Sequence, residues 1–487
     1  MIGLASFSDP RKTELEELRE AYVARCHANL KKRLVEAGFE VFDANQGVFG
    51  SKEFRSIKDL ESALAAASAL AKARCSGVVV GCWHWTETRL VEVLVEEVKK
   101  PVLLYAEKDP RWAGSTCIAA VGASLWENLA LAAVHHERAQ GGLDFVVKWC
   151  RSVEAIERLK KSRLMLFGGT YALGMTHLVD DFAALKKLIG EVVFVDQYVL
   201  VQKAEDILKS DPKRVGKFLR WLKEGGAYVE FDGKMLTEEI LRKQAALYLA
   251  AKDVVADVEG DVGVSVKCQP ELSELYGVDA CLIPAFLPFG EDFEGRKSVV
   301  PTVCEGDVKG LVTCMLLYYL SGEPPLFGDV KYVGDGFFLL ANCGASSVYY
   351  AALSEDASEN LPKLSLLPQC QGKGGAAVTY RTPSTEVTVA RLARVRGKYV
   401  MQYLVSEALE FTEELESVLS WGKTWPHTAI RLRIPSDLFL RVLASNHLSA
   451  VPGNWQEELE LACKLVNVET LDLGDEQACK DFLKKLS

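Results

Sequence analysis

Several features that define common protein classes are missing from this 487-residue sequence. No apolar run approaches the roughly 18 residues needed to cross a membrane, and the opening residues, MIGLASFSDPRKTELEELRE, lack the charged head and apolar stretch of a secretory signal. There is no long basic run, and the net charge of -10 opposes binding to a phosphate backbone. We therefore expect a cytoplasmic protein with neither a membrane nor a nucleic acid as partner.

Zinc-site and redox spacings are also missing, although the chain has 13 cysteines. None of them forms a CxxC pair or a Cys/His cluster with zinc spacing. Most lie in apolar surroundings, such as Cys314 in VTCMLLYY, where a reduced cysteine acts as a small hydrophobic side chain. We expect reduced core thiols, with disulfide bonds between some of them as the open alternative.

What the sequence does contain is ordinary globular composition, with 49% hydrophobic and 25% charged residues, and length for about three domains. In the first third, helical periodicity over 12–37, 57–74 and 87–99 alternates with the apolar runs EVFDA, GVVVG and PVLLYA. Apolar strands that alternate with helices predict a parallel sheet covered on both faces. No GxGxxG motif accompanies this pattern, so a nicotinamide-dependent oxidoreductase is unsupported.

The rest of the chain changes texture near residue 330. KKSRLMLFGG (160–169) begins a second α/β unit, with strands near 164–168, 192–196 and 262–267 and a long helix over 235–257. Beyond 330, short alternating runs such as EVTVARLARV and KYVMQYLV are divided by glycine and proline, which is typical of β structure. We predict two Rossmann-like α/β domains, 1–160 and 161–330, followed by a β-rich domain over 331–487.

The second of these predicted domains carries carboxylates at the end of a strand and at the start of a helix. In VVPTVCEGDVKG, Glu305 and Asp307 flank Gly306 directly before an apolar helix. An aspartate at a helix start commonly caps the helix, so capping and ligand binding are both open for Asp307. Glu271 follows the strand VGVSV, and ligands of open α/β sheets bind beyond the carboxyl ends of strands. Two such carboxylates can share a divalent metal or act as an acid–base pair, whereas an exposed Glu271 is the alternative.

Histidines are few, and one of them stands at an informative place. His427, in KTWPHTAIRL, follows a proline at a loop-to-strand junction. A lone histidine is more often a surface or core residue than a ligand, so both interpretations stay open. His135 and His136 lie in a helical pattern, where neighbouring side chains point about 100° apart, so chelation of one ion by both is poor and no role is assigned to them.

Six stretches of the sequence resemble motifs of the L-fucose isomerase and L-arabinose isomerase superfamily, in the same order along the chain, and the L-fucose isomerase branch most closely. CEGDVKGLVTCMLLYYLSGEPPLFGDV is similar to the central acidic motif of that family, and KCQPEL to the strand end that carries its glutamate. WPHTAI is similar to its proline–histidine element, and GKGGAAVTYRTPSTEVTVARLARVRGKYVM to its C-terminal β segment. SDPRKTE and GCWHWTET resemble its early arginine turn and tryptophan motif.

The resemblance implies an aldose–ketose isomerase that acts on L-fucose, D-arabinose or a related free sugar through an enediol. It implies Glu271, Asp307 and His427 as ligands of Mn²⁺, or of another divalent cation such as Mg²⁺ or Co²⁺, with Glu271 and Asp307 also moving the proton. Arg11 and one of Trp83 or Trp85 match sugar-pocket positions, the tryptophan coming from a neighbouring subunit. A barrel-like C-terminal domain and a homo-oligomer, a trimer or hexamer, are also implied.

Two departures from the family pattern concern the expected sugar pocket. Asn342 stands where relatives often carry a histidine, and Thr428 follows His427 where a second histidine is common. We place Asn342 in the substrate pocket. The same departures motivate the alternative function, a non-catalytic sugar-binding or regulatory paralogue that keeps the isomerase fold.

Overall fold

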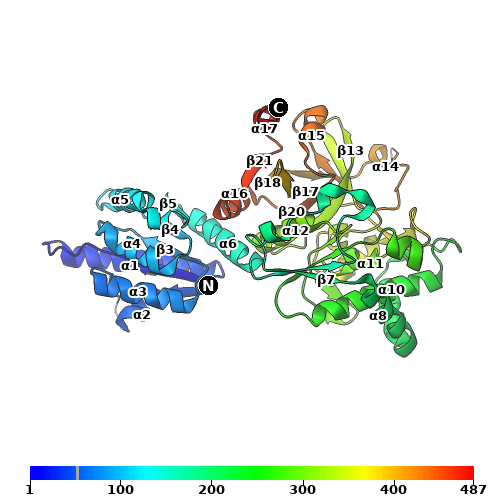
Figure 1. The fold of residues 1–487 in the computed structure, drawn as a ribbon, viewed down its shortest axis with the longest axis horizontal. Helices are drawn as coiled ribbons and strands as arrows, with labels where there is room; N and C mark the ends of the chain where they lie inside the picture. The colour runs from blue at the N-terminus through cyan, green and yellow to red at the C-terminus, as the bar shows by residue number, and fades with distance from the viewer. Residues whose placement is uncertain (51–53, 418, 487) are drawn as a thin grey trace. The chain divides into compact units, whose positions relative to one another are not determined.

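The computed structural model describes residues 1–50, 54–417 and 419–486 of the chain, which divides into two compact units, Met1–Glu157 and Arg158–Ser487 (Figure 1). Within these ranges, no helix combines the length and the apolar character that spanning a bilayer requires.

The first unit is built on a parallel sheet with strand order β2-β1-β3-β4-β5. β1, β3 and β4 are buried along their whole length, as expected for strands that helices cover on both faces. The predicted alternation is confirmed, but the helical interpretation of the histidine pair is wrong, because His136 begins β5. The elements are β1 Ile2–Ser6, α1 Glu16–Glu36, β2 Val41–Asp43, α2 Ala44–Phe49, α3 Leu60–Ala73, β3 Gly77–Gly81, α4 Thr88–Val98, β4 Val102–Ala106, α5 Gly114–Glu127, β5 His136–Gln140 and α6 Leu143–Leu159.

The second unit begins with another parallel sheet, in the order β12-β9-β6-β7. Its three predicted strands and its long helix, α10, are confirmed. The sheet and its helices comprise β6 Arg163–Phe167, α7 Phe182–Leu185, β7 Glu191–Val195, α8 Gln197–Ser210, α9 Pro212–Glu224, α10 Glu238–Ala256, β9 Val262–Val266, α11 Leu282–Phe286, β12 Thr302–Cys304 and α12 Val308–Ser321.

A closed barrel follows in the same unit. Six strands of the described residues are joined in the ring β17-β20-β13-β14-β19-β18, which the β17–β18 hairpin closes, and β21 adds to β18 in parallel. The predicted fold class, α/β units followed by a barrel-like domain, is therefore confirmed. The barrel region comprises β13 Leu326–Gly334, β14 Phe337–Ala341, β17 Thr385–Val395, β18 Lys398–Leu409, β19 His427–Arg431, α15 Ser436–Val442, β20 His447–Pro452, α16 Gln456–Leu465, β21 Glu469–Asp472 and α17 Glu476–Leu486.

Helix α12 connects the parallel sheet to the barrel and fixes where the two meet. Its N-cap is Asp307, whose side chain accepts a hydrogen bond from the backbone N–H of Gly310 at 2.9 Å. The predicted helix start is thus confirmed. α12 packs against β20 and β17, so the end of β12 lies beside these two barrel strands.

Candidate metal centre

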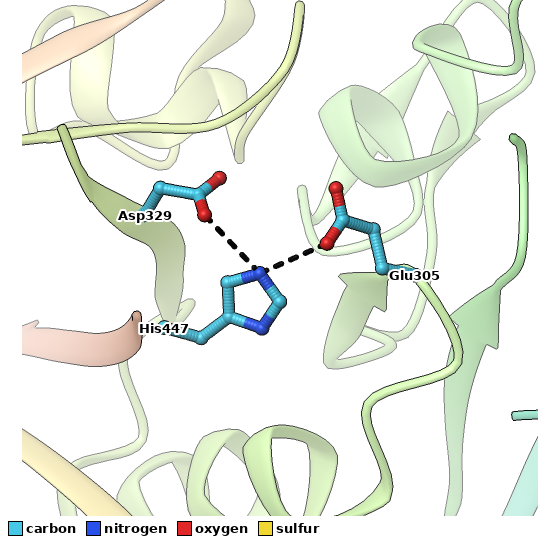
Figure 2. Close-up of side chains that lie close together, drawn as sticks. All are labelled: Glu305, Asp329 and His447. Carbon is cyan, nitrogen blue, oxygen red and sulfur yellow. Dashed lines mark ion pairs between the residues drawn. The ribbon is translucent and has the colours of Figure 1, made fainter. Parts of the chain in front are cut away.

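Three potential metal ligands meet where β12 ends against the barrel. Glu305, Asp329 and His447 form the group of three, among the described residues, whose ligand atoms all lie within 4.8 Å of one another. Nε2 of His447 is 3.1 Å from Oε2 of Glu305 and 3.4 Å from Oδ1 of Asp329. Figure 2 shows both carboxylates directed at this one nitrogen.

Strand register brings two of the three ligands together. Asp329 on β13 and His447 on β20 are direct partners in an antiparallel pair. Directly opposed residues point to the same face of a sheet, with Cβ atoms about 5 Å apart. The carboxylate and the imidazole are therefore neighbours as soon as these strands pair.

A tight turn aims the third ligand. Glu305 is the first residue after β12 and has a φ of 68°, and Gly306 follows with a φ of 70°. A Cβ on Gly306 would lie 2.6 Å from Cα of Thr170 and 2.7 Å from the carbonyl oxygen of Gly169. The close approach of the 169–170 segment thus requires glycine at position 306, and the turn directs Glu305 towards the barrel.

A buried carboxylate orients the imidazole from its other side. Nδ1 of His447 lies 2.8 Å from Oδ2 of Asp307, and because a carboxylate only accepts, we assign the Nδ1 proton to this bond. Both guanidinium Nη atoms of Arg391 also donate to Asp307. Burial raises the pKa of Asp307, but Arg391 and His447 outweigh it and hold that pKa well below its usual range. Asp307 therefore stays ionised and turns Nε2 of His447 to the other two carboxylates.

A second side chain holds Asp329. Nδ2 of Asn446 donates to Oδ1 of Asp329 at 2.6 Å, and Oδ1 of Asn446 is 2.8 Å from Nε2 of His177. Glu305 and His447 are buried, whereas the Asp329 side chain keeps 29% of its surface exposed. Solvent and small molecules therefore reach the group from the side of Asp329.

The donor set fits a divalent cation. Within the described chain, neither Oε2 of Glu305 nor Nε2 of His447 has a hydrogen-bond partner, although both atoms are buried. Burial lowers the pKa of His447, but Asp307, Asp329 and Glu305 outweigh it and raise that pKa well above its ordinary value, so these carboxylates favour a positive charge at Nε2. One imidazole with carboxylate oxygens suits Mn²⁺, Mg²⁺ or Co²⁺ better than softer ions.

The residues that the resemblance implied as ligands are not brought together. Asp307 lies behind His447 and is engaged with Arg391. Glu271 begins a one-turn helix, Glu271–Tyr276, and pairs with Lys267 at 2.6 Å. His427 begins β19, where its Nδ1 contacts the carbonyl oxygen of Trp425 and its Nε2 lies 2.9 Å from Nζ of Lys331. Among the described residues, the close-set group is the one around His447 instead.

The residues predicted to bind sugar have different surroundings. Arg11, in the first unit, is exposed and pairs with Asp9 at 2.7 Å. Trp83 is buried, and its Nε1 donates a hydrogen bond to Oγ of Ser6. Trp85 is half-buried, so of the two tryptophans it is the one with side-chain surface exposed to a ligand. Asn342 is buried and donates to Sγ of Cys304, directly beside Glu305. Their roles towards a sugar stay predictions.

Sequence reasoning missed two of the three residues at the centre and gave the third a supporting part. Asp329 is the aspartate that closes the PLFGDV segment of the central motif, and Glu305 is its first carboxylate. His447 is preceded by Asn446 and starts the alternating run HLSAV. The available signals for Asp329 and His447 were that each belongs to a strand and has polar neighbours.

Comparison with known proteins bears on the barrel. No curated protein matches the chain. The family model described as "L-fucose isomerase, C-terminal domain" matches residues 340–473, which run from the end of β14 to just beyond β21 and include His447. The resemblance seen in the motifs is thus confirmed for this region, which is similar to the C-terminal domain of L-fucose isomerase.

Proposed function

We propose that the protein is a divalent-metal-dependent aldose–ketose isomerase acting on a free sugar, with Glu305, Asp329 and His447 as the metal ligands. The observation that carries the proposal is the convergence of two carboxylates on Nε2 of a histidine whose Nδ1 is already engaged by Asp307. The L-fucose isomerase C-terminal match supports the reaction class, because it includes His447.

The reaction moves a proton from C2 of an aldose to C1 through an enediol. A divalent cation in such a site supplies Lewis-acid polarisation of the substrate oxygens. Each carboxylate keeps one oxygen turned away from the closest approach to His447, Oε1 in Glu305 and Oδ2 in Asp329. These two oxygens are the groups that we propose accept the C2 proton and return it at C1.

The other residues keep this arrangement fixed. Asn446 restrains the Asp329 carboxylate through Oδ1, which leaves Oδ2 for the proton. Asp307 and Arg391 hold the imidazole from behind. Because Glu305 is buried at the end of β12, its carboxylate faces the substrate in a partly desolvated setting, where charge interactions are stronger.

The test is ketose formation from a panel of aldoses that includes L-fucose and D-arabinose, after EDTA treatment and again with added Mn²⁺. We expect activity to disappear with EDTA and to return with Mn²⁺. A folded protein that binds Mn²⁺ and sugars but turns over no aldose would instead be the non-catalytic paralogue. Activity that survives complete metal removal would contradict the metal-dependent mechanism. Light scattering on the same preparation tests the proposed trimer or hexamer.

A further inference from the structure

A lysine without an acidic partner lies on the same strand as Asp329. Nζ of Lys331 is 2.9 Å from Nε2 of His427, and in the described part of the chain no carboxylate lies within 4 Å of it. Lys331 is partly exposed, so a ligand can reach its ammonium group. An uncompensated cation this close to a metal centre needs an explanation, because half-buried charges are normally paired.

The partner that Lys331 does have leaves its charge intact. His427 is fully buried, and its Nδ1 donates to the carbonyl oxygen of Trp425 at 2.7 Å. Nε2 therefore carries the lone pair that accepts from the ammonium. An ammonium has three N–H donors, so two remain after the bond to His427. His427 thus positions the cation without neutralising it.

Strand register places this cation at a defined distance from the metal centre. One row of directly paired residues crosses four strands: His447, Asp329, Ala341 and His427. Their side chains share one face of the sheet. Two strand spacings separate Asp329 from His427, on the order of 10 Å. Between them stands Ala341, which has the smallest side chain of the row. The span is comparable with a five- or six-carbon chain.

Direct contacts also link the two places. Sγ of Cys343 lies 3.7 Å from Oε1 of Glu305, and Cys343 packs with Ala341 and Trp425. Nζ of Lys331 is 5.9 Å from the centre of the Trp425 ring. A molecule with its reacting carbons at Glu305 and its far end at Lys331 would therefore lie along one continuous wall.

We propose that Lys331 binds an anionic group at the end of the substrate remote from the reacting carbons. This inference rests on the proposed isomerase function and names its substrate class, an acidic aldose whose terminal carbon carries a phosphate or carboxylate group. Charge-assisted hydrogen bonds from an ammonium to such oxyanions are roughly twice as strong as neutral ones. A neutral hydroxyl on the substrate can accept the same N–H but gains less from the positive charge. An anion site therefore prefers an anionic ligand over a neutral one of the same length, whereas a hydroxyl site does not.

The test is calorimetric binding of three chain-matched polyols, glucitol, glucitol 6-phosphate and gluconate, to the Mn²⁺-loaded protein. None has an aldehyde or ketone group to isomerise. We expect at least one anionic polyol to bind roughly tenfold more tightly than glucitol, because a hydrogen bond to a charged group is worth more than one to a neutral group. The preferred anion identifies the phosphate or the carboxylate.

Variants assign the preference to one side chain. Lys331→Gln is expected to remove the preference, because it weakens binding of the anionic polyol far more than binding of glucitol. Lys331→Arg is expected to retain the preference, which shows that the site is intact. Lys398→Gln removes an exposed lysine at the start of β18 and is the matched control, with the preference unchanged. Equal binding of all three polyols, or equal losses for neutral and anionic polyols in Lys331→Gln, would overturn the proposal.

The outcome is separable from that of the isomerase proposal. If no aldose is turned over, a Lys331-dependent preference for an anionic polyol, measured with and without Mn²⁺, still supports the anion site. If neutral aldoses are isomerised with Mn²⁺ but no anionic polyol is preferred, the isomerase proposal stands and the anion site is refuted.

Discussion

Oδ2 of Asp307 accepts a hydrogen bond from Nδ1 of His447 at 2.8 Å, although 140 residues separate the two in sequence. Arg391 binds the same carboxylate, and all three side chains are buried. A histidine has two ring nitrogens, and this bond decides which one faces Glu305 and Asp329. Asp307 therefore caps α12 and also positions the imidazole of the proposed metal centre.

Asp307→Asn is expected to weaken Mn²⁺ binding by about 10- to 100-fold, the range typical of groups that orient a metal-binding histidine. The free energy of unfolding should also fall by about 3–5 kcal/mol, because Arg391 is left as a buried, uncompensated charge. Equilibrium dialysis of Mn²⁺ and urea unfolding measure the two effects.

A double variant separates these effects. Asp307→Asn with Arg391→Met removes the stranded charge, so stability should recover in part while Mn²⁺ affinity stays low. Recovery of both properties would show that Asp307 acts on the metal centre only through stability.

The ligand assignment predicts which carboxylates matter for metal binding. Glu305→Gln, Asp329→Asn and His447→Gln should each reduce Mn²⁺ affinity by more than the roughly 100-fold upper range of a supporting residue. Glu271→Gln is the matched control, because it removes a carboxylate that pairs with Lys267 and lies outside the group. Electron paramagnetic resonance of free Mn²⁺ gives the affinities. If Glu271→Gln abolished binding and Glu305→Gln did not, the assignment implied by the resemblance would replace the one proposed from the geometry.

Gly306→Ala should damage both stability and the metal centre. The new Cβ would meet the Gly169–Thr170 backbone at a φ of 70°, so we expect a loss of about 2–4 kcal/mol in unfolding free energy and weaker Mn²⁺ binding as Glu305 shifts. Gly336→Ala is the control, since its φ is 80° but nothing lies within 4 Å of an added Cβ. It should cost about 1–2 kcal/mol and leave Mn²⁺ affinity unchanged. Similar losses of stability in the two variants would show that the contact with residues 169–170 is unimportant.

The pH dependence of stability should report the buried state of His427. Burial, with the charges of Lys331 and Arg381, lowers the pKa of His427 to about 3. Because the unfolded imidazole titrates near 6.5, acid protonates the unfolded chain first. The unfolding free energy should therefore fall as pH drops below 6.5, by up to about 1.4 kcal/mol per pH unit from this group. Urea unfolding at pH 7, 6 and 5 in EDTA, for the wild type and His427→Gln, isolates the contribution, and parallel curves would contradict it.

The periodic parts of the fold could be predicted from sequence, and the irregular part could not. The apolar pattern within GVVVG and within the segment after Asp307 is enough to identify a strand and a helix, and both elements form as expected. His136 shows the limit of this reasoning, because a short strand after an alanine-rich segment has too few residues to reveal its period.

The site depended on information that local patterns do not contain. Glu305 is aimed by a positive φ at a residue other than glycine, which no composition rule predicts. Asp329 and His447 meet because β13 pairs with a strand that begins more than a hundred residues later, and strand order is not encoded locally. Asp307 could be singled out from its place at a helix start. Its carboxylate is engaged by the Gly310 N–H and by Arg391, so it does not join the group formed by Glu305, Asp329 and His447. His427 occupies the same row of the barrel, two strands from Asp329.

The order of the three proposed metal ligands along the chain has a consequence for biosynthesis. Glu305 and Asp329 are synthesised before His447, which belongs to β20, the strand that pairs with β13 and β17 in the closed ring. Until that strand is made and inserted, the nascent chain has two carboxylates and no imidazole to complete the group. Capture of the ion would then be one of the last events in maturation, and occupancy would distinguish finished molecules from those still awaiting ring closure.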